Sequence, residues 1–464
     1  MPLRIEPIFD WINGKSPILI HTPWTGHYGN CAEEMYFGLL KARRDSKKTV
    51  FLFRHPLFWK LRITVSNREL FNIESDYSAV RFGGKWRYLG GLLLALVYGP
   101  LRALYMGQIV YARSLRIVNY LRPRWRLPYL ALFSISIPSI GDRYLYRPDG
   151  IDNFSWDIVE NLEWRQQFDA PLNVRLTHDK RRRAEDIRAA MGISQSDWFV
   201  CLHVREGGFR DDRQFRSHRN SSIQNYIKGI QAITDLGGWV VRMGDSSMTP
   251  LPAMERVIDY PHTPFKCELM DIYLTSACRF YIGTNSGPVE VARLFQKPMV
   301  LINLNDWSMT FPVQMGDLAI IKHIFSRSRN RFLSLKEILD GTAEDQSLPF
   351  LRREEYVMFD NSEEEICDVI EEYLDRPKRY EYSELQETFN HERRLQLRRW
   401  LDGKTVAPTD IHLNSDNDLD NTYTKYRIVS RTDSVAGAVG QKYLEQNWLV
   451  DNLEKSSFRP LIEN

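Results

Sequence analysis

The stretch from residue 198 to residue 303 alternates short apolar runs with segments of helical spacing, and this alternation limits the fold more than any other feature. The apolar runs are WFVCLHVR (198–205), WVVRMG (239–244), CRFYIGT (278–284) and PMVLIN (298–303). Each run has the length of a buried strand. Strands that alternate with helices build parallel sheets covered by helices. The sequence therefore predicts an α/β fold with a doubly wound parallel sheet.

Two helices are expected between these runs. Residues 220–238 open on Ser221 and Ser222, which are typical helix-start residues, carry isoleucines at helical spacing and end in a glycine pair. The second helix is PVEVARLFQ (288–296). Nearer the N-terminus, residues 16–54 have the order strand, loop, helix and strand. A Rossmann-like half-domain begins in this order.

The rest of the chain predicts further helices and a division into domains. Expected helices are 361–375, capped by Asn361 or Ser362, then 378–403 and 440–453, with an Asp/Asn-rich loop at 410–423. The 464 residues exceed the roughly 250–300 at which a single core stops growing. We expect two Rossmann-like domains followed by an extension. Their bounds are 1–180, 181–375 and, for a helical or irregular C-terminal extension, 376–464.

An apolar insertion at residues 88–112 has Arg102 as its only charge. It has the roughly 20 residues that a membrane-spanning helix needs, but glycines and Pro100 interrupt it and basic residues flank both ends. The pattern favours a helix or hairpin at a membrane surface. A buried core helix and a true span are the alternatives.

Charge and cysteine content exclude several classes of protein. A net charge of +3 gives no general nucleic-acid signature. The five cysteines form no CxxC pair, so we expect neither a zinc ribbon nor a dithiol redox site, and Cys201 and Cys278 are expected to be buried. The cysteine pattern and the lack of a signal peptide favour the cytoplasm. We expect no metal, because Asp211 and Asp212 are adjacent rather than spaced as Asp-x-Asp.

Small, polar and basic residues follow four of the predicted strands. Ligands of open parallel sheets bind outside the carboxyl ends of the strands. The candidates there are Gly26, His27, Gly29 and Asn30 after the first strand; His203 and Arg205; Arg242, Gly244 and Asp245; and Thr284, Asn285, Ser286, Gly287 and Glu290.

Arginine side chains and a helix start make this edge a candidate phosphate site. The turn 284–288 opens a helix, whose N-terminus suits an anion, although a plain helix cap is the alternative. The guanidinium groups of Arg205 and Arg242 could each bind two phosphate oxygens. Ion pairs with Glu206, Asp211 or Asp245 are the alternative for both arginines. For His203 the alternative is a buried histidine with satisfied hydrogen bonds.

The motifs CLHVREGGFRDDR, RNSSIQNYIKGIQAITDLGGWVVRMGDSSM and VIDYPHTPFKCELMDIYLTSACRFYIGTNSGP resemble a bacterial family of glycosyltransferases encoded among surface-carbohydrate genes. More distantly, residues 26–30 are similar to the G-x-x-G-N loop of the fucosyltransferase superfamily, and His203-Val204-Arg205 to its H-x-R strand. Residues 283–290 resemble the pyrophosphate loop of heptosyltransferases, which has an Asp and a His where this chain has Asn285 and Glu290.

This resemblance implies a GT-B fold, in which two Rossmann-like domains face each other across a cleft. The nucleotide-sugar donor would bind the C-terminal domain, with Arg205 on its diphosphate, and the acceptor would bind the domain at 1–180. The implied reaction is a metal-independent, inverting hexosyl or fucosyl-like transfer to a surface-carbohydrate, glycan, lipid-linked or protein acceptor. It needs no cofactor. The candidate bases for the acceptor hydroxyl are His27, Glu33, Glu34 and Asp211.

Two alternatives to a glycosyltransferase remain at this stage. One is a non-catalytic nucleotide- or sugar-binding subunit of a membrane-associated glycan assembly. The other is a different transferase on the same scaffold, and the absence of a G-x-x-x-x-G-K-[ST] motif counts against a P-loop enzyme. The expected location is the cytoplasm, with contact to the inner face of the cytoplasmic membrane if residues 88–112 bind it.

Overall fold

The computed structural model describes residues 3–4, 18–21, 23, 27–44, 46–51, 65–78, 89, 114, 133–134, 145–147, 150–152, 171–208, 217–305, 312, 314–341, 348–377, 380–402 and 436–448. The chain divides into two compact units. One comprises Met1–Glu160 with Val406–Asn414, and the other Asn161–Thr405 with Ser415–Asn464. The domain bounds expected at residues 180 and 375 stay predictions.

The first unit contains the predicted strand–helix–strand passage. Strand β2 (Ile18–His21) pairs in parallel with β3 (Lys48–Phe51), and helix α2 (Tyr28–Arg44) connects them. Most residues of α2 from Cys31 to Ala42 are buried, including Met35 and Leu39, so the helix is packed on nearly all sides. One detail of the prediction is wrong. The resemblance to a G-x-x-G-N loop placed Gly29 and Asn30 in a loop, whereas the helix already begins at Tyr28.

The remaining described elements of the first unit are short. They are β1 (Leu3–Arg4), parallel to β5 (Phe133–Ser134); β6 (Leu145–Arg147), antiparallel to β7 (Gly150–Asp152); the 3-10 helix η1 (Arg68–Asn72); and β4 (Ile73–Glu74). Residues 88–112 lie outside the described residues, apart from Leu89. Within the described parts of the chain, no helix has both the length and the apolar character needed to cross a membrane.

The second unit is built on a sheet of seven parallel strands. In spatial order they are β11 (Val257–Asp259), β10 (Trp239–Arg242), β9 (Phe199–His203), β12 (Tyr281–Gly283), β13 (Met299–Leu304), β14 (Leu318–Ile321) and β18 (Ala438–Val439). Counted from β9 along the chain, the first six have the doubly wound order 3-2-1-4-5-6. The parallel sheet is therefore confirmed, and β11, β14 and β18 extend it beyond the four predicted strands.

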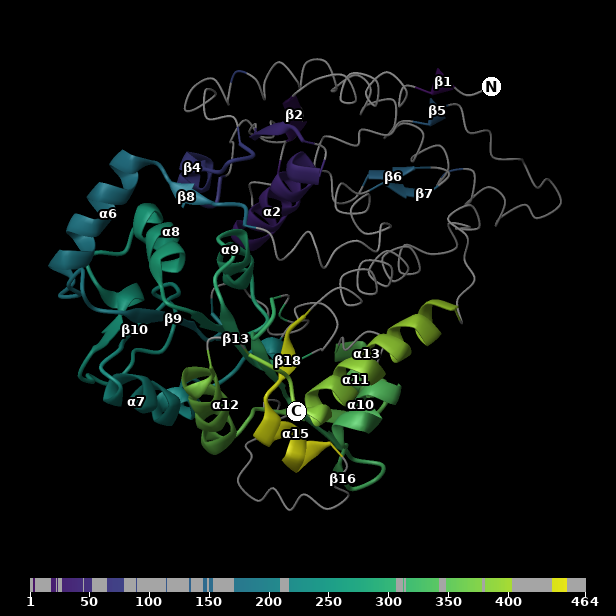
Figure 1. The fold of residues 1–464 in the computed structure, drawn as a ribbon. Helices are drawn as coiled ribbons and strands as arrows, with labels where there is room; N and C mark the ends of the chain where they lie inside the picture. The colour runs from purple at the N-terminus through teal and green to yellow at the C-terminus, as the bar shows by residue number, and fades with distance from the viewer. Residues whose placement is uncertain are drawn as a thin grey trace. The chain divides into compact units, whose positions relative to one another are not determined.

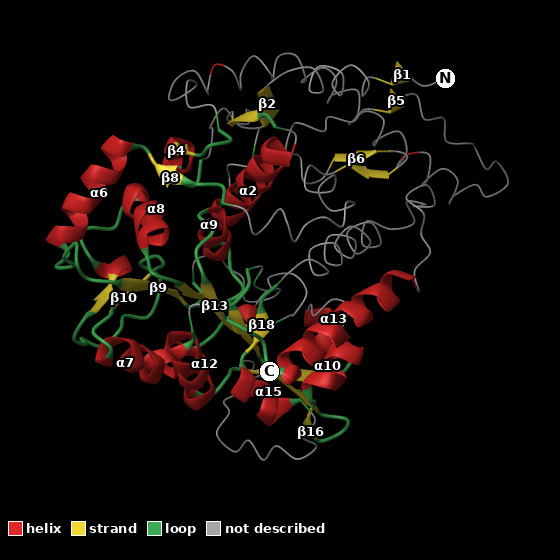
Figure 2. Cartoon of the chain, viewed as in Figure 1, coloured by secondary structure: helices red, strands yellow, loops and turns green. Residues whose placement is uncertain are grey.

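Helices cover both faces of this sheet, as a doubly wound fold requires (Figures 1 and 2). On one side lie α6 (His178–Ala190), α8 (Glu268–Ala277) and α9 (Pro288–Leu294), and on the other α7 (Ile227–Asp235) and α12 (Glu363–Asp375). A short 3-10 helix, η4 (Ile223–Tyr226), precedes α7, and Ser222 caps it by accepting a hydrogen bond from the Gln224 amide. The helix start predicted at this serine is confirmed.

The core of the unit also follows the sequence pattern. All five residues of β9 and all six of β13 are buried, and Cys201 and Cys278 are buried as expected. At the start of α12, Ser362 and Glu365 form a reciprocal capping box, so the predicted cap is Ser362.

The predicted C-terminal extension contributes a strand to the sheet. Strand β18 pairs with β14 through Leu318–Ala438 and Ala319–Val439, and α15 (Gln441–Asn447) follows it, consistent with the predicted closing helix. Helix α13 (Glu384–Asp402) lies within the helix predicted at 378–403. The other elements of the unit are β8 (Arg175–Leu176), η3 (Ser217–Arg219), η5 (Tyr260–His262), β15 (His323–Ser326), β16 (Arg331–Phe332), α10 (Leu335–Gly341), α11 (Leu348–Arg353) and β17 (Tyr356–Phe359).

A buried ion pair between Lys322 and Asp360 connects residues 220–222 to the carboxyl end of β14. Lys322, which directly follows β14, is fully buried and donates from Nζ to the Asp360 carboxylate and to the Asn220 carbonyl oxygen. The other carboxylate oxygen of Asp360 accepts from the Ser222 amide at 2.9 Å. Burial lowers the pKa of Lys322, and Asp360 opposes that shift. The pair therefore holds residues 220–222 against the carboxyl end of β14.

Replacing Lys322 by methionine should destabilise the protein by about 3–5 kcal/mol, because it leaves Asp360 buried without its counter-charge. The double variant Lys322→Met/Asp360→Asn should recover much of that loss, since asparagine retains an acceptor for the Ser222 amide. Urea unfolding would measure both. Lys442→Met, which removes an exposed lysine paired with Asp368, is the control and should cost less than about 1 kcal/mol. Equal losses for Lys322→Met and Lys442→Met would contradict this role.

Candidate functional site

From β9 the chain continues toward one edge of the sheet, and from β12 toward the other edge. The carboxyl ends of β9 and β12 therefore form the winding point, at which the strand order reverses. The two strands are neighbours, but the chain leaves β9 toward α7 on one face and leaves β12 into α9 on the other (Figure 1). Open α/β sheets bind ligands in the crevice at such a point. Of the predicted residues, His203, Arg205, Thr284, Asn285 and Ser286 lie here.

Thr284 ties the two strand ends together. Its amide donates to the His203 carbonyl oxygen at 3.3 Å, and its Oγ1 accepts from the Arg205 amide at 3.1 Å. The Arg205 carbonyl oxygen in turn accepts from the Ser221 amide at 2.8 Å. Thr284 is fully buried, whereas Arg205 is half-buried. The amide and the carbonyl group of Arg205 are thus both hydrogen-bonded, which fixes its backbone at the edge of the sheet.

His203 and Ser286 form a second contact across the same point. Nδ1 of His203 lies 3.0 Å from Oγ of Ser286, and both residues are 6% exposed. Burial, followed by the charges of Arg205 and Arg242, lowers the pKa of His203 to about 4. The imidazole is therefore neutral at physiological pH.

Arg219 is a site residue that the sequence did not single out. Its Nε and one terminal nitrogen both donate to the Asn285 carbonyl oxygen, at 3.1 and 2.6 Å, and the same nitrogen donates to Asn285 Oδ1 at 3.0 Å. The side-chain amide of Asn285 donates onward to Asn305 at 2.7 Å. Asn305 follows β13 as Asn285 follows β12. Its position directly after a strand was the one feature of the sequence that could have marked Asn305 as a site residue. The sequence could not place Arg219, because it lies in the short helix η3 and not directly after a strand.

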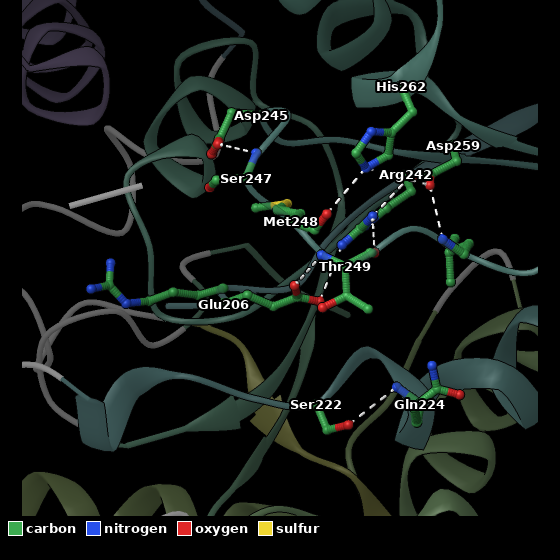
Figure 3. A network of polar contacts seen from close by, with 12 residues as sticks. Glu206, Ser222, Gln224, Arg242, Asp245, Ser247, Met248, Thr249, Asp259 and His262 are labelled. Carbon is green, nitrogen blue, oxygen red and sulfur yellow. Dashed lines mark hydrogen bonds and ion pairs between the residues drawn. The ribbon is translucent and has the colours of Figure 1, made fainter. Parts of the chain in front are cut away.

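Arg242 is occupied by ion pairs, so the structure favours that alternative over a phosphate contact. The side chain is fully buried, with one terminal nitrogen 2.9 Å from Asp259 and the other 3.1 Å from Glu206 (Figure 3). It also donates to the Thr249 carbonyl oxygen at 2.8 Å. Two carboxylates around one guanidinium more than neutralise its charge. Arg242 therefore joins β10 to β11 and to the loop after β9.

The other residues predicted after β10 shape a turn. Gly244 has φ +151°, a conformation that strains any L side chain, and an added Cβ would also require the Met248 side chain to move. Asp245 accepts from the Ser247 amide at 2.9 Å, and Glu206 accepts from the Thr249 amide at 2.8 Å (Figure 3). These bonds hold the turn at the edge of the sheet.

The predicted helix start at Gly287 is present but short. Gly287 is the N-cap of α9 and Pro288 its first residue, as expected, yet the helix has only seven residues. Glu290 pairs with the buried Arg293 at 2.7 Å. A dipole that sums over so few peptides adds less to anion binding than the sequence argument assumed.

The candidate bases belong to the first unit or lie outside the described residues. His27, Glu33 and Glu34 lie at or in α2 of the first unit, as do Gly29 and Asn30, and Glu33 is buried. Gly26 and Asp211 lie outside the described residues. Among the side chains that the structure describes, no group of three His, Cys, Asp or Glu residues is arranged to hold a metal ion.

Comparison with known proteins gives a structural likeness but no match of sequence. No protein-family model matches the sequence, and no curated protein matches it. A solved structure of a glycosyl transferase family 9 protein from Veillonella parvula DSM 2008 is 12% identical, with a TM-score of 0.38 over 77% of this chain and 96% of that chain. A likeness of this degree does not identify the activity of the chain.

Replacing Arg242 by methionine should destabilise the second unit by about 3–5 kcal/mol, because Glu206 and Asp259 would then face each other without a counter-charge. Urea unfolding would measure the loss. The matched control is Arg181→Met, which removes an exposed arginine paired with Glu185 within one helix and should cost less than about 1 kcal/mol. An Arg242→Met protein as stable as the wild type would show that the ion pairs do not hold these strands together.

Proposed function

We propose that this protein is a glycosyltransferase whose nucleotide-sugar donor binds at the carboxyl ends of β9 and β12. The observation that carries the proposal is the convergence of Arg205, His203 and the 284–286 turn at the winding change of a doubly wound sheet. In folds with this strand order, nucleotides bind at this position with their diphosphate beside the strand ends. The fold alone hosts many activities, so sugar transfer is inferred from the site together with the motif resemblance.

Arg205 is the proposed ligand of the donor diphosphate. Its backbone is fixed by hydrogen bonds to Thr284 and Ser221, so its half-buried side chain starts from a defined position. A guanidinium can bind two phosphate oxygens at once and stays charged at every physiological pH. The segment after β9 has no G-x-G-x-x-G sequence, in which backbone amides would take this role. The resemblance of His203-Val204-Arg205 to the H-x-R strand of fucosyltransferases supports the same assignment.

The proposed reaction is a direct displacement at the anomeric carbon, with inversion. As the bond between the sugar and the diphosphate breaks, negative charge grows on the leaving oxygen, and Arg205 would stabilise it. A preorganised donor at such a position is worth about 3–4 kcal/mol in the transition state. A base removes the proton of the acceptor hydroxyl, and His27, Glu33, Glu34 and Asp211 remain the candidates.

The wider setting is proposed on the resemblance. It comprises a GT-B arrangement with the donor in the C-terminal domain, a surface-carbohydrate, glycan, lipid-linked or protein acceptor, and a cytoplasmic location. Membrane contact through residues 88–112 is part of the same proposal. If that segment lies at the membrane surface, apolar area and basic charge would hold it there.

A nucleotide- or sugar-binding subunit without catalysis is the second candidate. His27, Glu33 and Glu34 belong to the first unit and Asp211 lies outside the described residues, so the proposed reaction has no assigned base. Such a subunit would bind the donor but neither transfer nor hydrolyse it. Measuring donor binding and donor hydrolysis on the same preparation separates the two candidates.

Arg205→Ala should weaken the binding of nucleoside diphosphates by about 10- to 150-fold, which corresponds to the loss of a charge-assisted hydrogen bond worth about 1.5–3 kcal/mol. The measurement is calorimetric titration with the diphosphates of uridine, guanosine, adenosine and cytidine. Arg279→Ala is the matched control, since Arg279 precedes β12 at the opposite end of the same sheet. Normal binding by a folded Arg205→Ala protein would remove Arg205 from the donor site.

Sugar transfer should continue in excess EDTA, because the proposed site neutralises the leaving diphosphate with arginine rather than with a metal ion. The assay compares transfer with and without the chelator and then after adding magnesium or manganese. Arg205→Ala should lower the turnover measured in EDTA. Loss of activity in EDTA that either ion restores would contradict metal independence, and the loop around Asp211 would then be examined for ligands.

A further inference from the structure

Nδ1 of His203, Oγ of Ser286 and the carbonyl oxygen of Thr284 together determine which nitrogen of His203 carries the proton. Oγ of Ser286 lies 3.3 Å from the Thr284 carbonyl oxygen and 3.0 Å from Nδ1 of His203. A serine hydroxyl has one proton, and a carbonyl oxygen can only accept. Both contacts are therefore hydrogen bonds only if Ser286 donates to Thr284 and the Nδ1–H of His203 donates to Ser286.

This arrangement leaves Nε2 of His203 without a proton. A neutral imidazole has one N–H group, and the other nitrogen is an acceptor. Burial of the ring and the charges of Arg205 and Arg242 disfavour a second proton, and Asp245 acts in the opposite direction. Among the described residues Nε2 has no hydrogen-bond partner, and part of the residue stays accessible.

An unprotonated Nε2 is unsuited to a phosphate oxygen. Both atoms are acceptors at neutral pH, so no proton would lie between them. A hydroxyl group does supply a proton. His203 and Arg205 then complement different parts of a nucleotide sugar, although they are only two residues apart.

We propose that Nε2 of His203 accepts a hydrogen bond from a sugar hydroxyl of the bound nucleotide, and that His203 is not a phosphate ligand. This inference rests on the proposed nucleotide-binding function and assigns the residue that distinguishes the sugar portion of the ligand from its diphosphate. Ser286 is the positioning residue, because its single proton is committed to Thr284.

The tautomer can be measured without any ligand. Nitrogen NMR of protein labelled at its ten histidines separates protonated from unprotonated ring nitrogens, and His203→Asn identifies the signals of His203. We expect an Nδ1–H, Nε2-unprotonated ring in the wild type and a mixture of tautomers in Ser286→Ala. A wild-type ring protonated at Nε2, or one that gains a second proton near the ordinary pKa of 6.5, would overturn the inference.

Two matched variants test the contact itself. Asparagine reaches about as far as Nδ1, so His203→Asn retains a donor to Ser286 but has no atom at Nε2. Glutamine reaches about as far as Nε2 and can offer an acceptor there. We expect His203→Asn to weaken binding of uridine or guanosine diphosphate about tenfold, and His203→Gln to recover part of the loss.

Inorganic pyrophosphate, which has no sugar hydroxyl, is the second probe. His203→Asn should leave pyrophosphate binding within twofold of the wild type, whereas Arg205→Ala should weaken both probes. Equal losses of pyrophosphate and nucleotide in His203→Asn would show that His203 contacts phosphate and would overturn the inference. Failure of the wild type to bind any nucleoside diphosphate would instead overturn the proposed function and the ligand assignment with it, and the tautomer would still be decided by NMR.

Discussion

The parallel pairing of β9 with both β10 and β12 is the constraint on which the rest of the second unit depends. All five residues of β9 are buried, so its backbone polar groups must be satisfied by neighbouring strands on both sides. The chain leaves β9 and β12 toward opposite faces, because the crossover from β9 runs toward one edge of the sheet and the crossover from β12 toward the other edge. That reversal brings the residues after both strands together at one edge of the sheet, and Thr284 joins the two strand ends there.

Buried charge at this edge is handled in two ways. Where a charge is retained, it has counter-charges: Arg242 has Glu206 and Asp259, and Lys322 has Asp360. His203 avoids the cost of burial by staying neutral. Arg205 is half-buried and follows β9 at the edge of the sheet, where the proposed donor diphosphate would bind. The proposed division between a guanidinium for the diphosphate and an imidazole acceptor for a hydroxyl follows from these electrostatics.

The candidate site was only partly predictable. Arg205, Thr284 and Ser286 were recognisable because each follows a strongly apolar run, and residues after parallel strands meet at one edge. For Arg242 the sequence left a phosphate contact and ion pairs open, since a single sequence does not reveal that Asp259 on β11 lies beside it. Arg219 was missed for the same reason. Its place against Asn285 depends on the position of η3 beside the turn after β12.

The sequence by itself determined the elements whose signals are local. The apolar runs of β9, β10, β12 and β13, the isoleucine spacing of α7 and the capping serine of α12 are all written within short windows. Only the tertiary structure decided that Ala438–Val439 becomes a strand, since two residues carry no periodicity and form a strand only beside β14. It also decided the partners of Arg242 and the tautomer of His203. Those depend on side chains brought together from distant parts of the chain, and no local pattern encodes such distances.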